Sequence, residues 1–296
     1  MKAFGSPLSP VLADTICPNC HGVLIQGPQQ YLCRGCDHSF PVIGNIPILL
    51  KKDHQIVFEA PSPNIELRLK STLFFLRPIC DLTFPSASKT NLRLLRTLLH
   101  SDSLILFVGG GTEHQGLFVK ELGDRLLKKA VNLDVAPGKN VDLVADAHDI
   151  PFPDNYFEGV ICQVVLEHTR DSDRVVAELH RVLKPGGIVY AEAPFLQPVH
   201  MTSDFRRFTL LGLETLFADF ERIKSGVNGG IASALVLIAV QFFSTTLSFN
   251  LTMLYRFWRL LFRVLFFPFK FMDALLVRYS TTPLASSENF FLGRKV

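Results

Sequence analysis

The chain lacks a strong charge of either sign, because 30 Lys and Arg residues nearly balance 27 Asp and Glu residues and leave a net charge of +3. This small excess does not indicate a nucleic-acid-binding protein. Tryptophan is also scarce, with one residue against 26 phenylalanines, which concentrate toward the C-terminus. The first ten residues, MKAFGSPLSP, lack the apolar run of a secretory signal. We therefore expect a cytoplasmic protein.

Cysteine is sparse as well, yet four of the six cysteines form one tight pattern. Cys17 and Cys20 are two residues apart, as are Cys33 and Cys36, and a hairpin-length segment separates the pairs. Two such knuckles suit tetrahedral Zn(II), and four thiolates leave no open position, so the pattern predicts a structural zinc site. It favours a reducing compartment over a disulfide framework. Two redox pairs or unrelated thiols are the alternative.

The most informative stretch is residues 104–187, where strand-length apolar runs alternate with helical patterns. This alternation predicts an α/β protein with a doubly wound, Rossmann-like parallel sheet. The first run, LILFVGGG, ends in glycines, and the second ends in Asp134. Glycines let the backbone approach a ligand, and an acid at the second strand end can hold ribose hydroxyls. We therefore expect a cofactor that contains a nucleoside.

Several motifs occur in the order found in class I S-adenosylmethionine-dependent methyltransferases of the type 11 kind. They are VGGGT at 108–112, VNLD at 131–134, ADAHDIPF at 145–152, FEGVICQVVLEH at 157–168 and RVLKPGG at 181–187. The chain resembles this family over about residues 90–225 and again near 289–296. The resemblance implies methyltransferase activity with S-adenosyl-L-methionine as the cofactor.

The resemblance also implies the cofactor-binding residues. They are Gly109, Gly110, Gly111, Glu113, Asp134, Asp146, Ala147 and Gln163. Asp134 takes the place of the family's ribose-binding acid, and Asp146 with Ala147 that of the pair flanking the adenine. Two departures are Phe107, where the family usually has an acid, and Glu113, which replaces the last loop glycine and is a candidate contact for the cofactor's amino group.

Two other classes of function fit parts of the pattern. An NAD-dependent oxidoreductase would need a third loop glycine for close helix–strand packing, and His114 stands there. A non-catalytic binding or scaffold protein that keeps the methyltransferase fold is the stronger alternative.

The charges at the predicted strand ends suit S-adenosylmethionine. This cofactor is cationic and has no phosphates, so it needs no basic residues around it, and the acids at the strand ends suit its hydroxyl and ammonium groups.

The acceptor side is predicted at residues 194–209, PFLQPVHMTSDFRRFT, which follow the fifth strand of the expected sheet. The block resembles one in uncharacterised bacterial methyltransferases, some of them associated with surface-glycan clusters. His200 is the candidate catalytic base, and Asp204 is the candidate group that orients it. A structural, hydrogen-bonded His200 and a salt bridge from Asp204 to Arg207 are the alternatives.

An unusually apolar segment separates the last two expected strands. Residues 225–255 contain no charged side chain, and Arg256, Arg259 and Arg263 then recur at helical spacing among Phe and Leu. A basic amphipathic helix of this kind predicts peripheral attachment to a membrane surface. The expected acceptor is thus a small molecule of lipid-linked or glycan type. Helices that bury one another, or that pack across a homodimer, are the alternative.

The expected domain organisation follows from these patterns. The cysteine segment, about residues 14–51, resembles the small zinc ribbon that precedes some methyltransferases and the Trm112-like family. We expect a zinc-ribbon module at residues 1–52, a linker at 53–88 and a methyltransferase domain at 89–296. The hydrophobic helical insertion falls at about 229–285.

Overall fold

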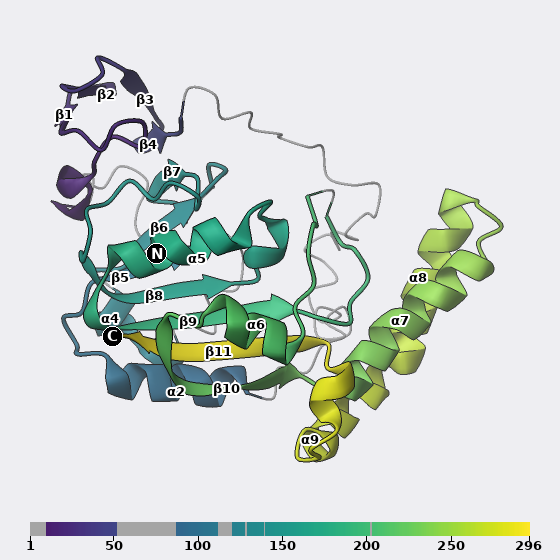
Figure 1. Ribbon diagram of the computed structural model, residues 1–296. Helices are drawn as coiled ribbons and strands as arrows, with labels where there is room; N and C mark the ends of the chain where they lie inside the picture. Colours follow the sequence, from purple (N-terminus) through teal and green to yellow (C-terminus); the bar gives the residue numbers. More distant parts are fainter. Residues whose placement is uncertain (1–9, 52–86, 112–119, 128, 139, 202) are drawn as a thin grey trace.

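A computed structural model describes residues 10–51, 87–111, 120–127, 129–138, 140–201 and 203–296 (Figure 1). The strands are β1 (Leu24–Gln26), β2 (Gln30–Cys33), β3 (Ser39–Ile43), β4 (Ile46–Leu49), β5 (Ile105–Val108), β6 (Val131–Asp134), β7 (Leu143–Ala145), β8 (Phe157–Gln163), β9 (Leu183–Pro194), β10 (Phe220–Gly229) and β11 (Glu288–Lys295). The α-helices are α2 (Ser88–Leu98), α4 (Asp124–Leu127), α5 (Ser172–Val182), α6 (Leu210–Leu216), α7 (Ile231–Thr246), α8 (Thr252–Phe266) and α9 (Asp273–Leu276). The 3-10 helices are η1 (Pro10–Asp14), η3 (Leu166–His168), η4 (Phe267–Met272) and η5 (Thr282–Ala285).

The strands form one 11-stranded sheet in the order β1-β2-β3-β4-β7-β6-β5-β8-β9-β11-β10. From β4 to β9 the neighbours are parallel, whereas β11 is antiparallel to both β9 and β10. The expected α/β sheet is confirmed. The strand order reverses between β5 and β8, and open α/β sheets bind ligands outside the carboxyl ends of the strands at such a point.

Helices cover both faces of the sheet. Residues of a strand point alternately to either side, and here the residues on both sides are apolar and buried. Ile105 and Phe107 of β5 share a buried cluster with Leu92 of α2. Leu106 and Val108 belong to the opposite cluster, which contains the apolar stripe of α5. Figure 1 shows α5 and α6 in front of the sheet. In the sequence, Leu92, Leu95, Leu98 and Leu99 recur at helical spacing, and this pattern correctly predicts the helix before β5.

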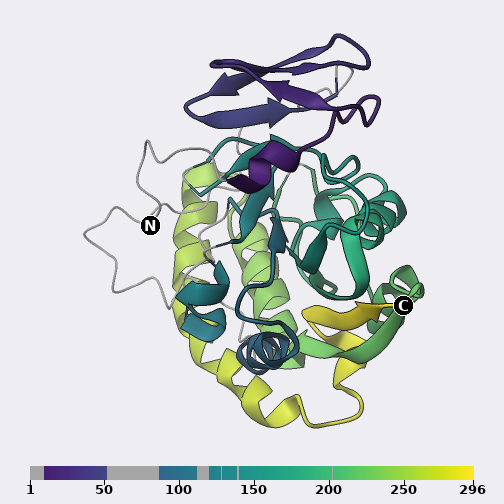
Figure 2. The same cartoon turned by 90° about the vertical axis from the view of Figure 1, so that its left-hand side faces the viewer.

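The cysteine-bearing strands belong to the same sheet as the central strands. β4 pairs in parallel with β7 through Ile48 opposite Val144 and Leu49 opposite Ala145. The Lys51 ammonium also lies 2.5 Å from the carboxylate of Asp149. Figures 1 and 2 show these N-terminal strands in purple at one end of the sheet. The predicted linker at 53–88 falls mostly outside the described residues, and α2 begins within its last residues.

The apolar segment between β10 and β11 forms a helical hairpin. Helices α7 and α8 run side by side and project away from the sheet (Figure 1). No residue of α8 is buried. With 16 and 15 residues, the two helices are about 22–24 Å long at 1.5 Å per residue. In the part of the chain that the structure describes, no helix has the length and apolar character needed to cross a membrane.

The base of the hairpin is held by one buried carboxylate. Gly230 precedes α7 and has no side chain to cap it, so Asp273 of α9 accepts hydrogen bonds from the N–H groups of Ala232 and Ser233 at 2.8 and 2.9 Å. Asp273 is fully buried. A Cβ atom at position 230 would lie 2.3 Å from its Oδ1, which explains the glycine. A carboxylate at a helix N-terminus also interacts favourably with the helix dipole.

Replacing Asp273 with Ala should lower the free energy of unfolding by about 1.5–3 kcal/mol, because two buried N–H groups lose a charged acceptor. Urea denaturation measures this loss, and hydrogen exchange should show faster opening of the first turn of α7. The exposed Asp219 gives a matched control, since Asp219→Ala removes a carboxylate without disturbing the cap. Equal stability of the two variants would show that the cap contributes nothing.

Candidate functional site

The glycine loop after β5 forms a tight turn against β6 and the exit of β8. The N–H groups of Gly109 and Gly110 donate to the carbonyl of Leu133 at 2.8 and 3.2 Å. Gly109 has a φ of +74°, and a Cβ there would lie 2.3 Å from Cγ2 of Val165. The turn therefore requires glycine at this position. Glu113, the other predicted contact of this loop, lies outside the described residues.

Asp134 ends β6 beside this loop, as predicted. Its Oδ2 accepts from the N–H of Gly111 at 3.0 Å, and its Oδ1 accepts from the N–H of Ala136 at 3.1 Å. The side chain is half-buried. Two backbone N–H bonds fix the carboxylate, and an ionised carboxylate has about four acceptor sites, so capacity remains for the hydroxyls of a ligand.

Asp146 and Ala147 follow β7 on the next strand end. Asp146 Oδ1 accepts from the N–H of His148 at 2.9 Å and lies 2.6 Å from Nδ1 of the same imidazole. Ala147 is buried, whereas the Asp146 side chain stays 21% exposed. The carboxylate is thus held by its own loop, and its side chain is partly accessible to solvent.

Gln163 ends β8, and its side-chain amide donates to the carboxylate of Glu192 on β9. Glu192 also accepts from Ser88 Oγ at 2.9 Å and from the hydroxyl of Tyr190. Burial raises the pKa of Glu192, although the hydrogen bonds from Tyr190 and Gln163 oppose the shift. Gln163 is therefore fixed by a buried polar network that the sequence did not reveal.

His200 and Asp204, the predicted catalytic pair, are in contact. Nδ1 of His200 lies 3.2 Å from Oδ2 of Asp204, and the backbone N–H of His200 donates to the same oxygen at 3.1 Å. Arg207 forms an ion pair with Asp204, with Nη2 donating to Oδ2 at 2.6 Å. The orienting contact and the structural salt bridge, which the sequence left as alternatives, thus occur together.

The ionisation of this pair follows from its surroundings. Burial opposes ionisation of Asp204, but Arg207 and the N–H of His200 outweigh it and hold the pKa of Asp204 below its ordinary value. Burial lowers the pKa of His200, and the charges of His168 and Arg207 lower it further, against the opposing effect of Asp204. A neutral imidazole beside an ionised carboxylate can accept a proton.

The structure adds two side chains that the sequence analysis did not select as site residues. Glu167 and His168 follow β8 in η3, and the His168 and His200 rings meet edge to face with centroids 5.0 Å apart. The Glu167 side chain is fully buried, and burial raises its pKa to about 8. The signal in the sequence was an acid and a histidine directly after the fourth strand of the expected sheet.

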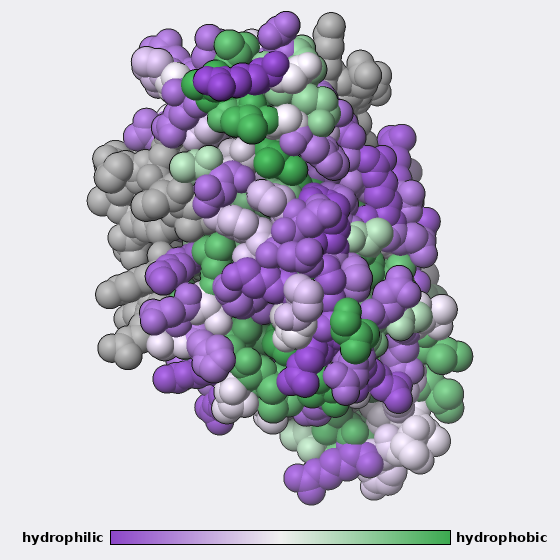
Figure 3. Space-filling view, turned by 60° about the vertical axis from the view of Figure 1, so that its left-hand side comes forward, coloured by the Kyte–Doolittle hydropathy of each residue, from purple (hydrophilic) through white to green (hydrophobic). Residues whose placement is uncertain are grey.

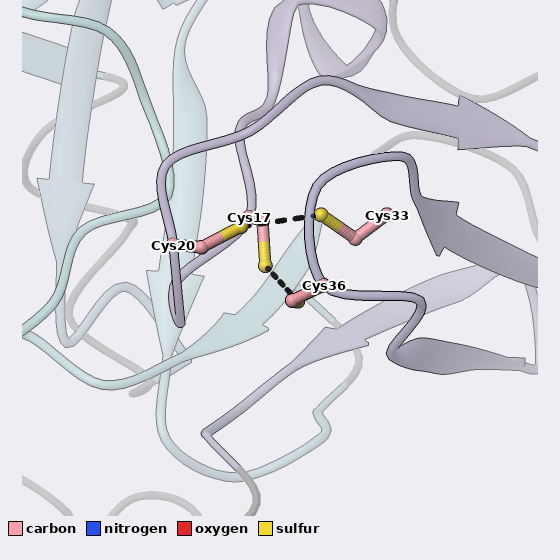
Figure 4. Close-up of side chains that lie close together, drawn as sticks. All are labelled: Cys17, Cys20, Cys33 and Cys36. Carbon is pink, nitrogen blue, oxygen red and sulfur yellow. Dashed lines mark hydrogen bonds between the residues drawn. The ribbon is translucent and has the colours of Figure 1, made fainter.

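The four predicted zinc ligands also come together (Figure 4). Sγ of Cys17 lies 3.7 Å from Sγ of Cys36, and Sγ of Cys20 lies 3.4 Å from Sγ of Cys33. Four thiolates about 2.3 Å from one zinc ion would be about 3.8 Å apart in a tetrahedron. The spacing fits such an ion and is too long for disulfide bonds.

Comparison with known proteins bears on this arrangement. Residues 108–191 match the family described as "Methyltransferase domain". They run from the glycine loop through most of β9 and contain the strand-end residues described above. The matches support a class I methyltransferase. Curated relatives that are similar to part of the chain are also named methyltransferases.

Two curated relatives are named ubiquinone/menaquinone biosynthesis C-methyltransferase UbiE. The protein from Psychromonas ingrahamii is 33% identical over 97 residues, which cover 31% of this chain and 39% of the relative. The protein from Neisseria meningitidis serogroup C is 38% identical over 90 residues, which cover 30% of this chain and 34% of the relative. The chain thus spans little more than a third of the length of these relatives.

A putative sarcosine dimethylglycine methyltransferase from Galdieria sulphuraria is among the similar solved structures. Its TM-score is 0.44 at 14% identity, with 71% of this chain and 84% of that chain covered.

Proposed function

We propose that this chain transfers a methyl group from S-adenosyl-L-methionine to an acceptor at the carboxyl edge of the sheet. The observation that carries the proposal is that two sets of residues lie at the same edge of the parallel sheet. The glycine loop follows β5, Asp134 ends β6, and His200 with Asp204 follows β9. One set suits the cofactor and the other suits the acceptor.

The cofactor set has the chemistry that S-adenosylmethionine requires. Bound there, the cofactor would supply an electrophilic methyl group on a sulfonium. Asp134 keeps acceptor positions for ribose hydroxyls, and the Asp146 side chain is partly exposed beside the buried Ala147. Holding the acceptor in line with the methyl group contributes most of the catalysis in such a transfer.

The acceptor set can remove a proton. The imidazole of His200 lies 3.2 Å from the Asp204 carboxylate, and its unprotonated nitrogen can accept a proton from an acceptor hydroxyl or carbon acid. The side chain of His200 is 39% exposed, so an acceptor can reach it. A non-catalytic scaffold is the alternative function, and it should show no uptake of the cofactor in calorimetry.

The cysteine cluster supports a structural zinc ion as part of the proposal. Cys17 and Cys33 are buried, Cys20 and Cys36 are exposed, and the N–H of Gly35 points at Sγ of Cys33 from 3.3 Å. The zinc would stabilise β1–β4, and β4 in turn extends the sheet beside β7. The metal would act through folding and not through chemistry at the acceptor.

The α7–α8 hairpin supports attachment to an anionic membrane surface. Phe257, Leu261 and Leu265 of α8 are 57%, 43% and 57% exposed. Arg256 and Arg259 recur on the same helix, where they can reach headgroups while the aromatic side chains enter the acyl boundary. The face turned away from the hairpin is mainly hydrophilic (Figure 3). An acceptor of lipid-linked or glycan type fits an enzyme held at such a surface, and a homodimer through the hairpin is the alternative.

Replacing Asp134 with Ala should weaken binding of S-adenosylmethionine by about 1–3 kcal/mol, because ribose loses a charged acceptor. His200→Ala should keep the affinity and lower transfer to lipid or glycan extracts by about 10²–10⁴-fold. Calorimetry and labelled cofactor measure the two effects. Asp154→Ala, an exposed acid remote from the site, serves as the control. A fully active His200→Ala variant would leave His200 with a structural role only.

Metal analysis of the purified chain should find one zinc ion held by the cysteine cluster. The double variant Cys17→Ser/Cys33→Ser should lose it and unfold at lower denaturant, because metal binding and folding are coupled. His21→Asn tests the exposed histidine next to the second cysteine and should keep the zinc. Wild-type protein that loses its zinc without any loss of stability would contradict a structural role.

The protein should cosediment with vesicles that contain anionic lipid and be only partly released by high salt, because screening removes the charge attraction but leaves the apolar contacts. Replacing Arg256, Arg259 and Arg263 with Glu should release it, since each basic residue contributes about 1 kcal/mol near such a surface.

The matched control is the triple change of Arg34, Arg96 and Lys129 to Glu, which shifts the net charge equally on exposed positions outside the hairpin. It should reduce binding far less. If the wild-type chain stays in the supernatant as a dimer, the hairpin is buried between subunits instead.

A further inference from the structure

Glu167 has a carboxylate that the surrounding protein leaves unsatisfied. Its side chain is 0% exposed, and neither oxygen accepts a hydrogen bond from the described residues. His168 Nε2 lies 3.7 Å from Oε1, which is beyond hydrogen-bond distance. Buried carboxylates are normally hydrogen-bonded, paired or bound to a metal ion, because an unpaired one is costly. Methyl transfer to an acceptor does not by itself explain why the Glu167 carboxylate is buried without a hydrogen bond.

His168 points one ring nitrogen toward Glu167, and His200 packs edge to face against His168. Nδ1 of His168 lies 2.8 Å from the carbonyl oxygen of Ser203, which only accepts, so Nδ1 carries the hydrogen. Nδ1 of His200 lies 3.2 Å from Oδ2 of Asp204. In a metal-binding imidazole the ring nitrogen that bears no hydrogen is the ligand atom, and for His168 this nitrogen is Nε2. The outer nitrogen of a metal-ligating histidine is typically fixed in this way by a carbonyl or a carboxylate.

We propose that Glu167, His168 and His200 bind a divalent cation. One donor atom from each of the three lies within 4.8 Å of the others. Three ligands about 2.0–2.2 Å from one ion, on the same side of it, lie about 3–3.8 Å apart, so side-chain movements of about 1–2 Å would complete the set. Two imidazoles and one carboxylate on one side of an ion are a recurrent transition-metal ligand set.

The ligands also indicate which cation class binds and what it does. Carboxylate and imidazole suit Mn²⁺, Fe²⁺ or Zn²⁺, whereas the four thiols select zinc at the other end of the sheet. Since His200 is partly exposed, coordination positions stay open toward solvent. The inference rests on the proposed function and changes one role in it. A cation held by His200 would acidify a bound acceptor hydroxyl, so His200 would act as a ligand in place of the general base proposed above.

Titration of the zinc-loaded full-length chain with Mn²⁺ alone tests the site, with the free ion followed by electron paramagnetic resonance. We expect one Mn²⁺ per chain, and at least tenfold weaker binding in Glu167→Gln, which keeps the shape of the side chain. Because the His200 side chain lies at the surface, His200→Ala should weaken Mn²⁺ binding similarly without affecting folding. Glu221→Gln makes the same change at an exposed position and should leave the affinity unaltered.

Absence of Mn²⁺ binding by the wild type, or binding that neither Glu167→Gln nor His200→Ala weakens, would overturn the site. Calorimetry with S-adenosylmethionine separates this result from failure of the proposed function. Cofactor uptake without Mn²⁺ binding would leave the methyltransferase and remove the cation. Mn²⁺ binding without cofactor uptake would leave the cation site and remove the methyltransferase.

Discussion

Hydrogen bonds between β5 and β8 pair Val108 with Cys162, so the turns after both strands leave the sheet at the same edge. The strand order reverses here, at the kind of switch point where open α/β sheets bind ligands. Pairing of Gln163 with Glu192 carries this edge on to β9. Residues from three distant stretches, the glycine loop, η3 and the segment after β9, therefore meet without any local sequence signal that links them.

The antiparallel pairing of β11 between β9 and β10 imposes the second constraint. Because both flanking strands belong to the sheet, the chain must leave after Gly229 and return before Glu288 at one place, where the N–H of Ser287 donates to the carbonyl of Gly229 at 2.8 Å. The hairpin of α7 and α8 thus leaves the sheet and returns to it at the same place. Its apolar side chains add little to the core of the sheet, which leaves them available for another surface.

Sequence periodicity and strand-end residues predicted the parts of the fold that depend on local pattern, such as α2, the strands around the glycine loop and the pair of His200 and Asp204. Three features depend on distant contacts and could not be predicted. β4, a strand of only four residues, pairs with β7 and so joins the central sheet. Asp273 caps a helix that begins about forty residues earlier. The unsatisfied state of Glu167 arises from burial by several elements, and no pattern in the sequence records it.

The loop after β9 shows why structure and chemistry need not be alternatives at Asp204. Its carboxylate is fully buried, a position that costs solvation unless the charge is paired, and Arg207 supplies the pair. The N–H of Phe205 donates to the carbonyl of Glu167 at 2.7 Å, which ties the same loop to η3. The salt bridge and this bond fix where His200 lies relative to His168 and Glu167. Without the salt bridge and this hydrogen bond, the loop would carry the same residues but would not hold His200 in a defined position beside His168 and Glu167. The ion pair of Asp204 and Arg207 is therefore a precondition for whatever chemistry His200 performs.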